Sequence, residues 1–289
     1  MQIDVLGILD VRENGVSITP TAPKPRQVLA LLALHADQVV PVYALTEELW
    51  AGQPPRSART TLQTYVLQLR DLITVALEGE ACAESESTPC RSAKDVLVTA
   101  PGGYMLVSGG GASDVRQFER LTATGCRAMD AGDFKEASRL LRDALDLWSG
   151  PAFADIQTGA RLDMEAKRLE ESRLCALDQR IEADLRLGRH RELLAELTVL
   201  TSRYHTHENL HAQFMLALHR SGRRGEALEV YHRLRGMLVR DLGLEPSARL
   251  RRLQQSILVA APESSLSAEA SLSTSAPLAS ARVGSARYA

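Results

Sequence analysis

The glycine-rich stretch from Ser108 to Ser113 divides the chain into two parts with different sequence periodicity. Before it, alternating segments rich in β-forming residues flank three helical segments. After it, nearly every segment up to Leu258 has the apolar spacing of three and four that predicts helices. Because 289 residues are about twice a usual domain length, we expect two domains with separate cores. These are residues 1–108 and 114–258, joined by a flexible linker at 109–113, with a disordered Ser- and Ala-rich tail at 259–289.

The order of the segments in the first part predicts a winged helix-turn-helix domain. An antiparallel hairpin comes first, three helices follow, and a second hairpin with Pro101-Gly102-Gly103 at its turn closes the domain. The expected ranges are, in this order, 3–19, 28–34, 43–50, 58–76 and 95–108. The predicted fold class is therefore mainly α: an α+β winged helix followed by an all-α domain.

The third expected helix has one apolar face and one polar face. The apolar positions recur every three or four residues: Ala58, Leu62, Tyr65, Val66, Leu69 and Leu72. Arginine, threonine and glutamine occupy the opposite side and its flanks: Arg59, Thr60, Gln63, Thr64, Gln68 and Arg70. These side chains can bind guanine, adenine, thymine methyl groups or phosphate, and an α-helix fits the major groove. The pattern also suits an ordinary solvent-exposed helix, but its place before a hairpin favours DNA recognition.

Further candidate DNA contacts lie outside this helix. Lys24 and Arg26 stand near the start of the first helix, and Lys94 and Tyr104 belong to the closing hairpin, the wing. Lysine and arginine are the usual partners of backbone phosphates. We therefore expect these four residues to hold the domain on DNA.

The net charge of the first part is negative. Residues 1–110 contain 8 Lys and Arg against 12 Asp and Glu, which gives −4. A generally basic DNA-coating protein is therefore excluded. Several of the acids fall in residues 77–93, which predict a solvated loop. Since phosphate attraction acts over about 8 to 10 Å, the position of the charges matters more than their sum.

The second part contains a weak internal repeat. Gly132-Asp133-Phe134, Gly188-Arg189-His190 and Gly222-Arg223-Arg224 open similar segments, and the last two are 34 residues apart. This is the period of tetratricopeptide repeats, in which stacked helical hairpins leave a concave surface for a partner. We therefore expect an all-helical interaction domain.

Other function classes lack the necessary motifs. Neither a phosphate-binding loop nor a nucleophile elbow occurs, so we expect no enzyme activity and no cofactor. His207 and His211 have metal-ligand spacing, but no cysteine pair accompanies them and no metal site is expected. The cysteines are spread without any C-x-x-C pair: Cys82, Cys90, Cys126 and Cys175. No apolar run approaches membrane-spanning length and no signal sequence is recognised, so a cytoplasmic, nucleoid-associated location is expected.

Several stretches together resemble one known family. They are KPRQVLALLALHADQVVPVYALTEELW, PPRSARTTLQTYVLQLRDLI, the wing APGGYML, LWSGPAFADI and LHAQFMLALHRSGRRGEALEVYHRLRGMLVRDLGLEP. Over roughly residues 1 to 258 the chain resembles the Streptomyces antibiotic regulatory protein family. Members of this family pair an OmpR-like winged helix with a bacterial transcriptional activation domain.

The resemblance implies a transcriptional activator of a secondary-metabolite gene cluster. It further implies binding to direct repeats in double-stranded DNA, as a head-to-tail homodimer, and recruitment of RNA polymerase. Two alternatives remain at this point. One is a repressor with the same fold; the other is a protein-interaction scaffold that does not bind DNA, which the negative charge of the first part would suit.

Overall fold

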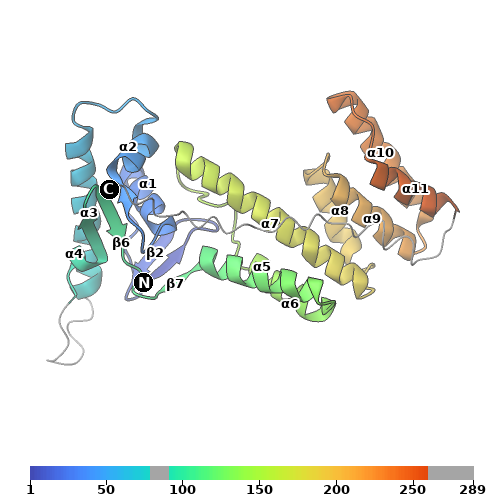
Figure 1. Cartoon of the computed structure of the whole chain (residues 1–289), viewed down its shortest axis with the longest axis horizontal. Helices are drawn as coiled ribbons and strands as arrows, with labels where there is room; N and C mark the ends of the chain where they lie inside the picture. Colours follow the sequence, from blue (N-terminus) through green and yellow to red (C-terminus); the bar gives the residue numbers. More distant parts are fainter. Residues whose placement is uncertain (79–90, 260–289) are drawn as a thin grey trace, which may run out of the picture. The chain divides into compact units, whose positions relative to one another are not determined.

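The computed structural model describes residues 1–78 and 91–259 of the chain and is mainly helical (Figure 1). It divides into two compact units, residues Met1–Ala183 and the part that begins at Asp184. Most of the expected acidic loop, residues 79–90, lies outside the described residues, and so does the expected disordered tail from residue 260 onward.

A small sheet opens the first unit. Its strands follow the order β3-β2-β1-β7, with β1 at Gln2–Asp4, β2 at Asp10–Glu13, β3 at Val16–Ser17 and β7 at Ala112–Ser113. The expected hairpin turn lies between β2 and β3. There Asn14 and Gly15 have φ angles of 52° and 78°, a conformation that these two residue types adopt more readily than most.

The last two residues of the expected linker at 109–113 belong to this sheet. Ala112 and Ser113 form β7, which pairs in parallel with Gln2 and Ile3 of β1. A Cβ atom on Gly111 would collide with the backbone of Met1. At this position glycine allows two strands to approach each other closely, and glycine content alone does not separate that role from flexibility.

Three helices and a second sheet complete the winged helix. The helices are α1 (Pro23–Leu34), α2 (Val42–Trp50) and α3 (Ala58–Glu78). The second sheet has the order β4-β6-β5, from Val40–Pro41, Gly103–Leu106 and Leu97–Ala100. The expected strand from residue 95 begins only at Leu97. The reason is local: Ser92 and Asp95 form a capping box that starts one helical turn, α4 (Ala93–Val96).

The first unit continues beyond the winged helix into α5 (Asp114–Asp130), α6 (Phe134–Leu145) and α7 (Ala160–Arg186). The last residues of α7 already belong to the second unit. One buried apolar cluster extends from the winged helix into these helices, and it includes Phe118, Leu141 and Phe153. The sequence predicts separate cores for residues 1–108 and 114–258; in the structure this buried cluster has members from Ile3 to Ala176, and the first compact unit ends at Ala183.

The second unit contains α8 (Leu193–Arg203), α9 (Glu208–Arg220), α10 (Arg224–Leu242) and α11 (Ala248–Val259). Helix α9 contacts α8, α10 and α11. The glycines that open the repeated segments, Gly132, Gly188 and Gly222, have φ angles of 76°, 76° and 79°. Each therefore supplies the left-handed turn after one helix, which is why the repeat begins with glycine. Among the helices that the structure describes, none is both long and apolar enough to cross a membrane.

Candidate nucleic-acid interface

Helix α3 has the two faces that the sequence predicts. Its buried positions are Ala58, Leu62, Val66, Leu69, Ile73 and Ala76. Of the expected apolar stripe, only Tyr65 and Leu72 are half-buried instead of buried. Helix α3 packs against α1, α2 and α4, so its position depends on the core of the winged helix and its outer face is left to solvent.

The polar face of α3 is exposed along its first three turns. Five predicted contact residues all have exposed side chains: Arg59, Thr60, Gln63, Thr64 and Gln68. Leu67 lies among them and is 58% exposed. An exposed leucine within a polar helix face suits contact with the methyl group of thymine, while the amides and the guanidinium suit base edges.

The turn before α3 and the first part of this helix are positively charged despite the negative total, and the two acids of α3, Asp71 and Glu78, follow later in the helix. From Arg56 to Arg70 the sequence has three arginines and no Asp or Glu. Arg56 is exposed in the turn before α3; it is not among the predicted contacts, although its place directly before the helix is a usable signal. A DNA phosphate within about a Debye length of this end of the helix would therefore be attracted by arginine side chains.

Several acids of the first part have partners of their own. Glu13 is 3% exposed and forms an ion pair with Arg91 at 3.0 Å. Glu47 pairs with Arg161 at 2.6 Å. These carboxylates are partly neutralised away from α3, and the total of −4 is therefore a poor guide to the charge of the α3 face.

The side chain of Arg70 is not free on the exposed polar face of α3. Its Nε and Nη2 atoms donate to the Leu97 carbonyl at 3.1 and 2.7 Å, and Nη2 also donates to Thr99 Oγ1 at 2.8 Å. The side chain thus attaches the wing strand β5 to α3. The DNA contact of Arg70 stays a prediction, and it would compete with these hydrogen bonds to β5.

Lys24 and Arg26 also have protein partners. Lys24 Nζ donates to the carbonyl of Leu49 at 2.6 Å, in the last turn of α2. Arg26 donates to the Pro20 carbonyl at 3.2 Å and forms an ion pair with Asp155. Lys24 donates to a carbonyl at the C-terminal end of α2, where a cation is favourable. Arg26 joins the winged helix to the loop before α7. In this structure neither side chain is free for a phosphate.

The two predicted wing residues differ from each other. Tyr104 is 8% exposed, pairs across the sheet with Val40 and Thr99, and belongs to the core. Its DNA contact stays a prediction, and a side chain so deeply buried has little surface for it. Lys94 is exposed, but it lies in α4 at the base of the hairpin. The exposed turn of the hairpin is at Pro101 and Gly102.

A buried carboxylate that is not among the predicted residues connects α2 to α7. Glu48 is 3% exposed, and its Oε atoms accept hydrogen bonds from the backbone N–H groups of Gly159, Arg161 and Leu162 at 2.5, 2.9 and 3.1 Å. The first N–H groups of a helix lack partners within the helix and carry partial positive charge. Glu48 therefore caps α7 from within the helix-turn-helix. Its pairing across 111 residues left no local signal in the sequence.

Asp114 makes a second connection of this kind. Its Oδ2 atom accepts from the N–H groups of Val5 and Leu6 at 2.6 and 2.7 Å, and Oδ1 accepts from Val115 at 2.7 Å. Burial raises the pKa of Asp114 to about 6, although these backbone hydrogen bonds act in the opposite direction. The carboxylate fixes the start of α5 on the N-terminal sheet.

His207 and His211 both make hydrogen bonds within the first turn of α9. His207 Nδ1 accepts from the Leu210 N–H at 3.4 Å, and the His211 ring bonds to the His207 carbonyl at 3.1 Å. Within residues 1–78 and 91–259, no three His, Cys, Asp or Glu side chains are grouped so that they could hold a metal ion.

Comparison with known proteins agrees with this architecture. Residues 113–258 match the family model of the bacterial transcriptional activator domain. The chain is 56% identical to the regulatory protein DnrI of Streptomyces peucetius over 262 residues, which are 91% of this chain and 93% of that protein. It is 35% identical to the regulatory protein AfsR of Streptomyces coelicolor, of which it spans 24%.

A solved structure has the same fold. It is that of Mycobacterium tuberculosis EmbR in complex with a low affinity phosphopeptide, with a TM-score of 0.80 and 32% sequence identity. The similarity covers 93% of this chain and 68% of the EmbR chain. A winged helix with an exposed polar third helix, followed by a transcriptional activator domain, defines the chain as a transcriptional regulator. It belongs to the Streptomyces antibiotic regulatory protein family.

Proposed function

We propose that this protein activates transcription of a secondary-metabolite gene cluster. It binds direct repeats upstream of the promoters as a head-to-tail homodimer, in the cytoplasm at the nucleoid, and recruits RNA polymerase. Residues 1–108 bind the DNA, and residues 114–258 form the activation domain. The observation that carries the proposal is the exposed face of α3. Five polar residues and Leu67 lie on this face, and the opposite face of the helix is buried in the core.

The residues of α3 suit different parts of a DNA site. Arg59 is exposed in the first turn of α3. From there its guanidinium can donate two N–H groups to a guanine. Gln63 and Gln68 can bind the adenine edge in the same groove. The Thr64 hydroxyl donates to the Thr60 carbonyl at 3.1 Å, which leaves its oxygen as an acceptor and its methyl group for apolar contact.

The continuous core of the first unit supports a direct mechanical connection between DNA binding and the helical domain. Glu48 lies in α2, immediately before the turn into α3, and caps α7. Helix α7 therefore starts from a point fixed to the DNA-binding domain. Binding of two chains to direct repeats would place two copies of this helical segment in a defined orientation upstream of the promoter.

The first test measures sequence preference. Duplexes are selected from a random library with the full chain, and gel shifts then compare the wild type with Arg59→Ala and Gln63→Ala. Val75→Ala is the control, since Val75 is 62% exposed on the same helix but lies beyond the proposed contact face. We expect each test variant to lose about 1 to 3 kcal/mol of discrimination between selected and random duplexes, and the control to lose none.

The outcomes separate this proposal from its alternatives. Unchanged preference in both test variants would remove α3 as the recognition helix. If the wild-type chain retains no duplex at physiological salt but binds a protein, it is a scaffold. A selected site that overlaps the promoter core, with transcription that rises when the site is removed, would indicate a repressor.

A further inference from the structure

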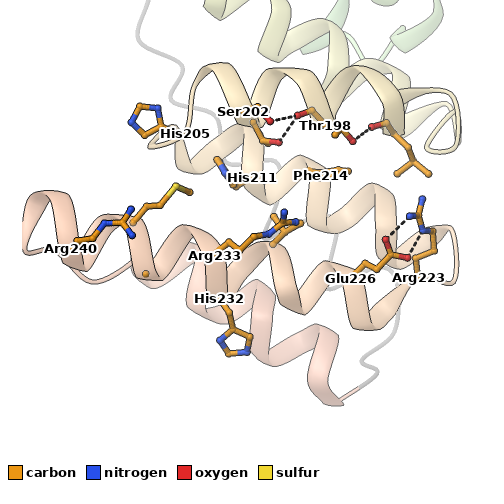
Figure 2. A pocket seen from close by; sticks show the side chains of 15 residues that line it. Thr198, Ser202, His205, His211, Phe214, Arg223, Glu226, His232, Arg233 and Arg240 are labelled. Atoms are coloured by element: carbon orange, nitrogen blue, oxygen red, sulfur yellow. Dashed lines mark hydrogen bonds and ion pairs between the residues drawn. The ribbon is translucent and has the colours of Figure 1, made fainter.

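The second unit contains a groove that DNA recognition by α3 does not use. Figure 2 shows α9 between α8 and α10, with side chains of all three helices around a cavity of about 710 Å³. Helix α10 lines the cavity at alternating intervals of four and three residues: Glu226, Val230, Arg233, Met237 and Arg240. One continuous face of α10 therefore forms a wall, as in the concave surfaces of stacked helical repeats.

The floor of the groove is apolar and uncharged. His211 and Phe214 of α9 are 3% and 8% exposed. Burial lowers the pKa of His211, which favours the neutral imidazole, and its Nδ1 lies 3.1 Å from the His207 carbonyl. Val230 and Met237 add apolar surface from α10. A partner would gain by burying at least one large apolar side chain here.

The rim of the groove is cationic. Arg223, Arg233 and Arg240 line it, and the only carboxylate in the lining, among the residues described, is Glu226, which already accepts from Arg223 at 2.7 Å. Arg240 pairs with Asp241 at 2.8 Å. Arg233 is exposed and has no ion pair or hydrogen bond with any residue of the described ranges. His232 points away from the other lining side chains (Figure 2). Within the described residues Arg233 therefore offers an unpaired guanidinium to an anionic partner, next to two arginines that already have carboxylate partners.

The side of the groove formed by α8 presents hydroxyl oxygens that can accept hydrogen bonds. Thr198 Oγ1 donates to the Leu194 carbonyl at 2.8 Å, and Ser202 Oγ donates to the Thr198 carbonyl at 2.9 Å. Because these hydroxyl protons are used within the helix, the hydroxyl oxygens can accept from N–H groups of a partner. A polypeptide backbone supplies such donors, whereas a phosphate chain does not.

The length of the groove favours a polypeptide over a compact small molecule. Arg223, the residue before α10, and Arg240 within it are 17 residues apart, which corresponds to about 26 Å at the rise of a helix. About eight residues of extended chain would span this distance. We propose that the groove binds an acidic peptide segment of a partner protein, one that carries carboxylates for the arginines and a large apolar side chain for the floor.

Fluorescence anisotropy with the full chain tests this proposal. The probe is a fluorescein-labelled peptide of about ten residues with alternating Glu and Leu and a central Phe. We expect Arg233→Glu to weaken its binding about tenfold, because attraction is replaced by repulsion. Arg252→Glu is the matched control: it reverses a charge on an exposed position of α11 outside the groove. Circular dichroism checks that both variants remain folded.

Two changes to the probe peptide test which of its side chains the groove binds. Replacing Glu by Gln, or Leu and Phe by Ser, should each abolish most of the binding. Absence of binding by the parent peptide, equal losses in the two protein variants, or full binding by the Ser peptide would overturn the proposal. Displacement of the peptide by random duplex DNA would instead assign the groove to nucleic acid. The Arg59→Ala variant should bind the peptide like the wild type, so this result is independent of recognition by α3.

Discussion

The sequence gives Lys24 and Lys94 the same predicted role, but their ammonium groups have different surroundings. Lys24 is half-buried and donates to the last turn of α2, whereas Lys94 is exposed on α4. A lysine that already donates to a carbonyl would have to break that bond before it could bind a phosphate. Hydrogen bonds made by charged groups contribute about 1.5 to 3 kcal/mol to stability.

This difference predicts opposite effects of two alanine substitutions. Lys24→Ala should lower the free energy of unfolding by about 1 to 3 kcal/mol and leave the salt dependence of DNA binding unchanged. Lys94→Ala should leave stability nearly unchanged and reduce the slope of log affinity against log salt by about one unit. Urea unfolding and gel shifts over a series of KCl concentrations measure both quantities. A reduced slope for Lys24→Ala would return Lys24 to the DNA interface.

At the scale of single residues, exposure was predictable and partners were not. The buried and exposed sides of α3 follow from local periodicity, and Gln63 and Thr64 are exposed as expected. The partner of Arg26 lies 129 residues away in the chain. Long-range ion pairs leave no periodic signal, and a side chain that ties two segments together has the same sequence appearance as one that binds phosphate.

At the scale of elements, the connection between α2 and α7 is the main addition to the predicted fold. Helix α2 carries adjacent glutamates with different environments. Glu48 accepts three backbone N–H groups and is buried, whereas Glu47 is 47% exposed and pairs with Arg161. A Cβ on Gly159 would collide with Glu48, so glycine is needed where α7 begins.

The two neighbouring glutamates form a matched pair for a stability test. Glu48→Ala leaves buried N–H groups without acceptors and should lower the free energy of unfolding by about 3 kcal/mol or more. Glu47→Ala removes only an exposed ion pair and should cost less than about 1 kcal/mol. Urea denaturation of the full chain measures both. Equal and small losses would show that the cap on α7 does not contribute to the first unit.

At the scale of the whole molecule, local sequence patterns predict which elements form, but not how the helices after the winged helix pack against it. The winged helix, the helical domain and the turns at Gly132, Gly188 and Gly222 follow from local patterns. Local patterns could not show that Ala112 and Ser113 join the N-terminal sheet, because β7 pairs in parallel with β1, more than 100 residues away in the chain. The continuous core that results makes Met1–Ala183 one unit.

The central claim is that the exposed face of α3 contacts bases in the major groove, and photo-crosslinking tests it most directly. A photoreactive amino acid is placed at Gln63, or at Val199 as a control, which is 67% exposed on α8 of the second unit. Each protein is bound to a duplex selected by the wild type and irradiated. We expect crosslinks from position 63 to bases of the major groove and none from position 199. Base crosslinks that are absent from position 63 while the complex is intact would contradict the claim.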